Sequence, residues 1–85
     1  MDIVLFSKTE CTYCLIAEDN LKRKNLPYKK LILEEDYSPN ELKDITGKDI
    51  DDIVFPVSVV DGETIIGAKD LHFHIRKMVR ANKTK

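Results

Sequence analysis

The first third of the chain constrains the fold most, because it passes from an apolar run typical of a strand to a helical spacing of apolar residues and then to a second strand. Ile3–Phe6 is a continuous apolar run, too short for a helix, and it predicts a strand buried on both faces. Pro27 ends the segment 11–25, and Tyr28–Leu33 predicts a second strand. A strand, a helix and a strand within about 30 residues predict a right-handed crossover between parallel strands. The helical spacing of segment 11–25 is carried by Cys14, Leu15, Ala17 and Leu21.

A second helix is predicted after residue 38 by its start and stop signals. Ser38 is a capping residue, Pro39 suits the first helical position, and Glu41 follows the serine by three residues. Gly47 stands where a helix of this length ends. The acidic segment 48–54 that follows is expected to be a solvated loop.

The last third of the chain predicts a hairpin and a final helix. Val57–Val60 and Glu63–Ile66 are short strands separated by Asp61-Gly62, a favoured two-residue turn. Lys69–Arg80 then has helical spacing, with Leu71, Ile75, Met78 and Val79 facing inwards. The expected order is βαβαββα, an α/β fold in which a four-stranded mixed sheet is flanked by three helices.

Length and charge limit the classes of function. A chain of 85 residues is expected to form a single domain over residues 1–85. Its 15 acidic and 14 basic residues nearly cancel, so charge predicts no affinity for nucleic acid or for an anionic membrane. No apolar run approaches the roughly 20 residues that cross a bilayer, and the N-terminus does not resemble a signal peptide. We therefore expect a cytoplasmic monomer.

The pair Cys11-Thr12-Tyr13-Cys14 carries the chemistry, because it opens the first helix directly after a strand. Residues three apart on a helix share a face, with Cβ atoms about 5–6 Å apart, so a disulfide can form with little movement. Either Thr9 or Cys11 caps the helix. Structural disulfides are rare in the cytosol, so the pattern predicts a reversible dithiol–disulfide couple.

The two sulfurs are expected to differ in reactivity. Cys11 lies at the helix start, where free N–H groups and the helix dipole stabilise a thiolate, and Lys8 adds positive charge nearby. Cys14 lies one turn further and is expected to be more buried. Cys11 is then the nucleophile that attacks a disulfide, and Cys14 is the thiol that resolves the mixed disulfide.

Two less specific interpretations of the cysteines are also open. One is a pair of buried structural thiols, which a position at the first turn after a strand does not favour. The other is a zinc site completed by His72 and His74. These histidines are two residues apart, which places them on different faces of a helix, so no metal is expected.

The chain resembles the glutaredoxin family, which has the thioredoxin fold, and the resemblance covers nearly the whole length. It rests on four segments: Cys11–Cys14, Phe55-Pro56, Asp61-Gly62 and Ile65–Leu71. The family pattern has Pro-Tyr between the cysteines; here Thr12 replaces the proline and Tyr13 is retained.

The resemblance implies a glutathione site around the cysteines. Pro56 would follow a cis peptide bond, and the backbone of Phe55 would pair with the cysteine part of glutathione. Lys8 would meet the glycine carboxylate, and Tyr13 would line the groove. The γ-glutamyl part would lie at the start of the final helix, whose residues there are Gly67, Ala68, Lys69 and Asp70.

One substitution leaves the electron donor open. Lys69 stands where the family has an acidic residue, which is similar to glutaredoxin-like redoxins that thioredoxin reductase reduces. The long segment 48–54 is similar to phage-type glutaredoxins. The resemblance therefore implies a glutathione-dependent disulfide oxidoreductase, reduced through glutathione and glutathione reductase, that acts on disulfide-containing or glutathionylated proteins. The alternatives are a redoxin that passes electrons from thioredoxin reductase to ribonucleotide reductase, and a glutaredoxin that binds an iron–sulfur cluster.

Overall fold

The computed structural model describes the backbone of residues 2–83 and the side chains of residues 2–79. A strand β1, Ile3–Ser7, leads into helix α1, Thr12–Arg23, and strand β2 covers Lys29–Ile32. The second half contains the remaining elements: α2 (Pro39–Thr46), a short 3-10 helix (Ile50–Asp52), β3 (Val57–Val60), β4 (Glu63–Ile66) and α3 (Ala68–Lys83). This order confirms the predicted fold class.

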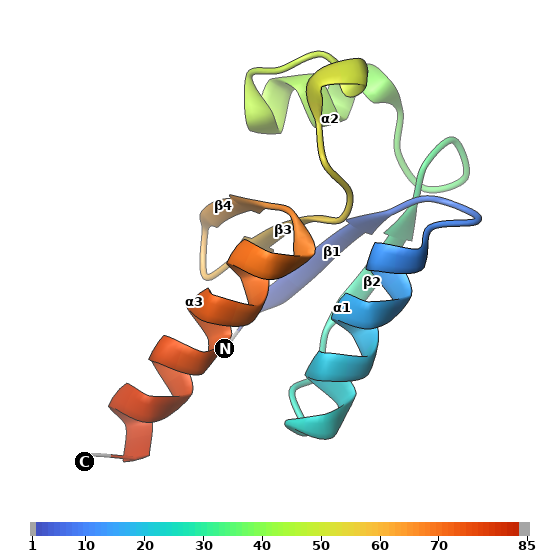
Figure 1. Ribbon diagram of the computed structural model, residues 1–85. Coiled ribbons are helices and arrows are strands. Elements are labelled where there is room, and N and C mark those ends of the chain that lie inside the picture. The colour runs from blue at the N-terminus through green and yellow to red at the C-terminus, as the bar shows by residue number, and fades with distance from the viewer. Residues whose placement is uncertain (1, 84–85) are drawn as a thin grey trace.

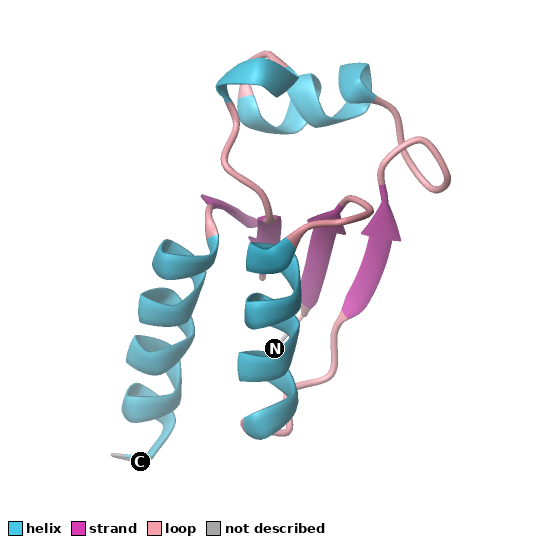
Figure 2. Ribbon diagram, turned by 45° about the vertical axis from the view of Figure 1, so that its right-hand side comes forward, coloured by secondary structure: helices cyan, strands magenta, loops and turns pink. Residues whose placement is uncertain are grey.

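The sheet has the strand order β2-β1-β3-β4. Strands β1 and β2 are parallel, as the crossover requires, while β3 is antiparallel to both β1 and β4. Phe6 of the central strand pairs with Leu31 on one side and with Val57 on the other. Helices α1 and α3 lie side by side on one face of the sheet, and α2 lies beyond the end at which β1 and β2 finish (Figures 1 and 2).

The capping and turn signals act as predicted. Ser38 Oγ accepts a hydrogen bond from the Glu41 N–H at 3.3 Å, and Gly47 ends α2 with φ 74°. The hairpin between β3 and β4 turns at Asp61 and Gly62, with φ values of 50° and 88°, which is the left-handed geometry that this turn needs.

Several expected boundaries and orientations are wrong. Helix α1 ends at Arg23, and α3 begins one residue early and continues to Lys83. Leu15 points outwards and is 63% exposed, although its spacing had placed it with the inward residues. The acidic segment is solvated at Asp49, Asp51 and Asp52 as expected, but it contains a turn of 3-10 helix that is followed by the buried Ile53.

The buried side chains form two groups. The first fills the space between the sheet and the helices α1 and α3, and it comprises Ile3, Leu5, Ala17, Leu21, Val60, Ile65, Leu71 and Ile75. The second group includes both cysteines, and it comprises Phe6, Cys11, Cys14, Tyr37, Leu42, Ile53, Phe55 and Val57. The cysteine pair is therefore part of the core at one end of the sheet. Among the described residues, no helix is long and apolar enough to cross a membrane.

Candidate active site

The cysteine pair lies at the junction of β1 and α1. After Ser7 the chain turns through Glu10, which has φ 54°, and Cys11 becomes the N-cap of the helix. Of the two capping residues that the sequence allowed, Cys11 is therefore the one used. Its Sγ accepts a hydrogen bond from the Cys14 N–H at 3.2 Å, the position that a serine or aspartate oxygen takes in other helices.

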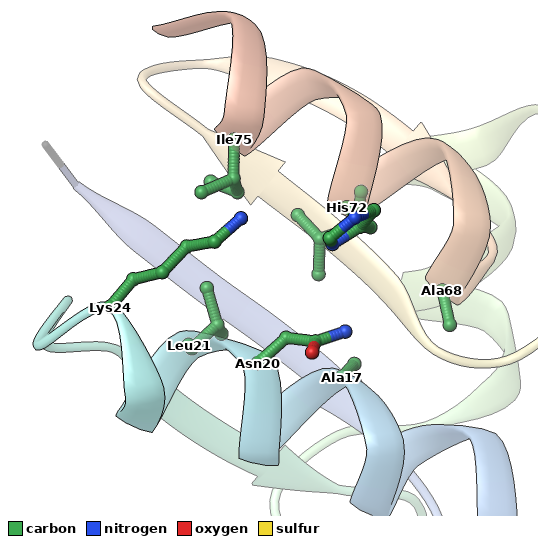
Figure 3. Close-up of a pocket in the computed structure, with 8 residues that line it drawn as sticks. Ala17, Asn20, Leu21, Lys24, Ala68, His72 and Ile75 are labelled. Carbon is green, nitrogen blue, oxygen red and sulfur yellow. The ribbon is translucent and has the colours of Figure 1, made fainter. Parts of the chain in front are cut away.

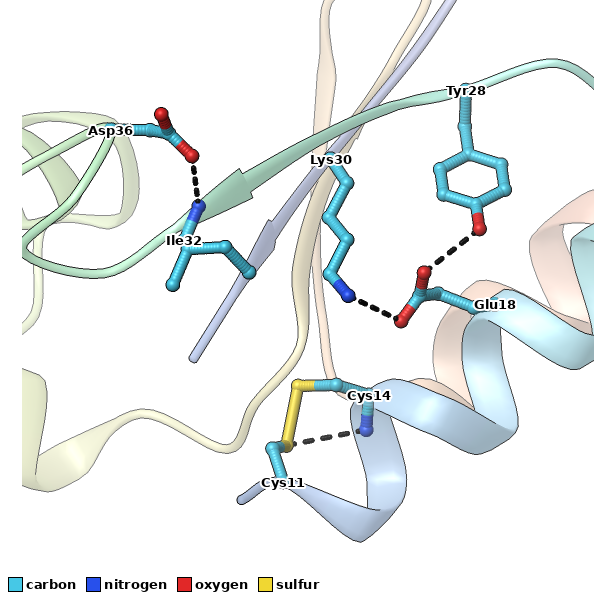
Figure 4. A network of polar contacts seen from close by, with 7 residues as sticks. All are labelled: Cys11, Cys14, Glu18, Tyr28, Lys30, Ile32 and Asp36. Carbon is cyan, nitrogen blue, oxygen red and sulfur yellow. Dashed lines mark hydrogen bonds and ion pairs between the residues drawn. A yellow bond between two sulfur atoms is a disulfide. The ribbon is translucent and has the colours of Figure 1, made fainter. Parts of the chain in front are cut away.

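The two sulfurs are joined in a disulfide (Figure 4). The Cα atoms lie 5.2 Å apart, within the range for disulfides, so one helical turn suffices to close the bond. Cys11 is 8% exposed and Cys14 is 1% exposed. Cys11 lies at the helix start and Cys14 is the more deeply buried of the two, as expected from their positions.

The segment before β3 brings a second part of the chain to the cysteines. The Phe55–Pro56 peptide bond is cis, as the resemblance implied. The Phe55 side chain packs in the same buried group as Cys11 and Cys14. The ammonium of Lys8 lies 5.0 Å from the centre of the Phe55 ring, so a cation stacks on this ring.

Gly67 connects this segment to the start of α3. Its N–H donates to the Pro56 carbonyl at 2.9 Å, and its own carbonyl accepts the Leu71 N–H at 3.2 Å, which opens the helix. Gly67 is buried with φ 96°, a conformation that favours glycine. The backbone at residues 67–70 is thereby fixed relative to Pro56.

The other proposed contact residues are less closely grouped. Tyr13 is 62% exposed beside the disulfide, and Lys69 is also exposed. Ala68 is half-buried and faces α1. Asp70 lines a shallow depression next to β4, together with Lys48 and His74, and neither cysteine lines that depression.

Sequence reasoning missed Tyr37, which positions the end of β1. The Tyr37 hydroxyl donates to the Ser7 carbonyl at 2.7 Å, and its ring meets Phe6 edge to face at 5.1 Å. Burial raises the pKa of Tyr37 to about 12, so the hydroxyl keeps its proton at neutral pH. The Leu33 N–H donates to the same carbonyl at 2.9 Å. An aromatic residue directly before the Ser38 cap was the available signal.

The two histidines of the zinc hypothesis lie on different sides of α3. His72 lines a cavity between α1 and α3 with Asn20, Lys24 and apolar side chains (Figure 3). That cavity measures about 10 Å³, no more than the space for one water molecule. His74 Nε2 lies 3.4 Å from a Glu63 carboxylate oxygen beside β4. In the described part of the chain, no three His, Cys, Asp or Glu side chains are grouped to hold a metal.

Comparison with known proteins identifies the family. The glutaredoxin family model matches residues 3–65. The mitochondrial glutaredoxin-2 of Mus musculus is 34% identical over 70 residues, which cover 82% of this chain and 45% of that protein. The chain thus spans less than half the length of this curated relative.

Solved structures share the fold. Glutaredoxin 1 from Francisella tularensis superposes with a TM-score of 0.70 at 18% identity, covering 93% of this chain and 96% of that one. A glutaredoxin from Archaeoglobus fulgidus gives a TM-score of 0.69 at 14% identity, covering 92% and 85%. The predicted thioredoxin-like fold is confirmed. Since the family model covers most of its length and the cysteine pair opens α1, the chain belongs to the glutaredoxin family.

Proposed function

We propose that this chain is a dithiol oxidoreductase that reduces protein or glutathione mixed disulfides through Cys11 and Cys14 and is re-reduced by glutathione. The observation that carries the proposal is the Cys11–Cys14 disulfide at the first turn of α1, beside Phe55 and the Phe55–Pro56 bond. Glutaredoxins as a family catalyse thiol–disulfide exchange, and this geometry supplies the two sulfurs that the exchange needs.

The reaction follows from the position of each sulfur. In the dithiol form, the Cys11 thiolate attacks a substrate disulfide, whose S–S bond breaks and releases one thiolate. Cys14 then loses its proton and attacks the Cys11 sulfur, which releases the second substrate thiolate and closes the Cys11–Cys14 disulfide. The substrate gains two electrons. The Cys14 N–H that reaches Cys11 Sγ is positioned to stabilise the thiolate form of Cys11.

Regeneration by glutathione needs two molecules of the tripeptide. The first attacks Cys11 and forms a glutathionyl mixed disulfide, and the second releases oxidised glutathione and restores the dithiol. We assign the backbone of Phe55 to the cysteine part of glutathione, because this residue precedes β3 and lies against the cysteine pair. We assign the Lys8 ammonium to a carboxylate of glutathione, and exposed Tyr13 to a contact with the same tripeptide.

The γ-glutamyl carboxylate is assigned to the start of α3. The N–H groups of Ala68, Lys69 and Asp70 have no acceptor within the helix, because the first intrahelical bond is made by Leu71. Gly67 acts differently, since its N–H is already bonded to Pro56. We therefore assign Gly67 the role of positioning the helix start rather than that of a donor to glutathione.

Lys69 favours a second candidate electron donor. An exposed lysine stands where the family carries an acidic residue, so a reductase with an acidic docking surface is the alternative source of electrons. The redoxin would then pass these electrons to a substrate such as ribonucleotide reductase. Cytoplasmic placement stays a prediction, and the mouse relative is named as mitochondrial.

A reductant comparison tests the proposal. The oxidised protein is supplied with NADPH and either glutathione plus glutathione reductase or thioredoxin reductase, and NADPH oxidation is followed with a model disulfide. We expect turnover with glutathione; turnover with thioredoxin reductase alone would instead establish the alternative. Lys69→Asp is expected to increase the glutathione-linked rate, while the control Lys77→Asp, on the exposed side of α3, leaves it unchanged.

A further inference from the structure

Glu18 is a buried acid one helical turn after Cys14. It is 7% exposed, although carboxylates are almost never buried without a partner. Residues four apart on a helix share a face, with Cβ atoms about 5–6 Å apart. Figure 4 shows the side chains of Cys14 and Glu18 leaving α1 on the same side. The mechanism proposed above makes no use of this carboxylate.

Two groups from the chain around β2 hold the Glu18 carboxylate in place. The Tyr28 hydroxyl donates to Oε1 at 2.9 Å, and Lys30 Nζ lies 3.1 Å from Oε2 (Figure 4). Burial, together with the hydrogen bond to Glu18 and its negative charge, raises the pKa of Tyr28 to about 12. The tyrosine is therefore a neutral hydrogen-bond donor at physiological pH and brings no charge to the carboxylate.

The compensating cation is more exposed than the acid. The Lys30 side chain is 39% exposed, whereas that of Glu18 is 10% exposed, so water screens the ammonium more effectively. Tyr37 belongs to the same buried group as the two cysteines, and burial keeps its hydroxyl neutral, while the Lys8 ammonium lies over the Phe55 ring of that group. Glu18 therefore places a carboxylate one helical turn after Cys14, and the lysine that faces this carboxylate is the more exposed partner.

We propose that the Glu18 carboxylate keeps the Cys14 thiol protonated while Cys11 ionises. A negative charge one helical turn away disfavours a second negative charge, and low exposure strengthens the effect. The opposing influence of the helix start is strongest at Cys11 and weakens within the first turn. Glu18 is then a positioning residue that acts through Cys14. The inference rests on the proposed function only in naming Cys11 as the attacking sulfur.

The test isolates Cys14 and titrates it. The chain has two cysteines, so in a Cys11→Ser background Cys14 is the single thiol, and its rate of alkylation by iodoacetamide is measured against pH. Adding Glu18→Gln keeps the shape and the hydrogen-bond acceptor but removes the charge. We expect the titration midpoint to fall by about one pH unit. Lys30→Gln removes the neighbouring cation instead, and we expect the midpoint to rise.

Asp19→Asn is the matched control, because it makes the same charge change on the next residue of α1, where the side chain is 57% exposed. It is expected to leave the midpoint unchanged. The proposal is overturned if Glu18→Gln moves the midpoint no further than Asp19→Asn does. It is equally overturned if Lys30→Gln lowers the midpoint, since loosened packing would then explain both shifts. No glutathione enters this measurement, so its outcome is independent of the reductant comparison.

Discussion

Cys11 is at once a helix cap and the proposed nucleophile. Its sulfur accepts the Cys14 N–H, an amide that otherwise has no acceptor at the start of a helix. A thiolate accepts such a bond more strongly than a thiol does, so the contact that begins α1 also favours the reactive form of the residue. The same hydrogen bond therefore caps helix α1 and favours the thiolate of Cys11.

Replacing each cysteine by serine separates their roles. Cys11→Ser keeps a capping side chain, so the protein is expected to fold and to lose all disulfide exchange. Cys14→Ser is expected to accumulate mixed disulfides at Cys11, detected by intact-protein mass spectrometry, while retaining glutathione-linked activity. Exchange that survives in Cys11→Ser would contradict the assignment of the nucleophile.

Tyr37 predicts a loss of stability at alkaline pH. Its pKa is about 12 in the folded protein, above the ordinary value of 10, so folding favours the protonated phenol. This contribution is complete below pH 10 and is lost as the pH rises towards 12. Urea unfolding across this range is expected to show a weaker decline for Tyr37→Phe than for the parent protein. Tyr28 titrates in the same range, so the comparison is repeated in a Tyr28→Phe background.

At the scale of elements, the start of α3 is set by a contact from outside the helix. The Gly67 N–H bonds to Pro56, and the helix opens directly afterwards at Ala68. Local sequence predicted a start one residue later, because this bond joins residues that only the folded hairpin brings together. In contrast, α2 carries its own signals in Ser38 and Gly47, and both were predicted correctly.

Replacing Gly67 or Gly47 by alanine separates the effect of backbone strain on stability from the effect of the α3 start on activity. Gly67 and Gly47 both have positive φ, and a Cβ at either position meets no atom closer than 3.9 Å. Alanine is therefore expected to lower the free energy of unfolding by about 1–2 kcal/mol at each position, through backbone strain alone. Glutathione-linked activity is expected to fall in Gly67→Ala and to persist in Gly47→Ala. Urea unfolding and steady-state rates measure the two effects, and equal loss of activity in both variants would refute the role given to Gly67.

The whole molecule is held together by side chains that α1 and α3 direct onto one face of the sheet. Leu71 and Ile75 of α3 are each 2% exposed and pack with Leu21 of α1. Because the first residues of α3 belong to the proposed glutathione site, the same packing that stabilises the fold also holds one wall of that site.

Truncating this contact is expected to destabilise the protein strongly. Leu71→Ala removes buried volume and is expected to lower the free energy of unfolding by about 2–5 kcal/mol, measured by urea denaturation. Phe73→Ala serves as the control on the same helix, because its side chain is 53% exposed. Its effect is expected to stay within about 0.5 kcal/mol. Similar losses in both variants would show that the inward face of α3 has been misassigned.

The sequence by itself determined the features that depend on neighbours along the chain. The spacing of Cys11 and Cys14, the cap at Ser38 and the turn at Asp61-Gly62 all follow from hydrogen bonds and dihedral preferences within a few residues. The placement of the cysteines directly after a strand also follows from local hydrophobic pattern. These local signals were sufficient for the element order and for the candidate nucleophile.

The tertiary structure alone decided which distant residues meet. The strand order β2-β1-β3-β4 brings Phe55 against the cysteines, and the bend after β2 brings Tyr37 to Ser7. From the sequence, Glu18 would be expected on the surface of its helix. In the structure it is buried, because Lys30 of β2 forms an ion pair with its carboxylate. Such contacts depend on the packing of faces that lie far apart along the chain, and no local preference encodes them.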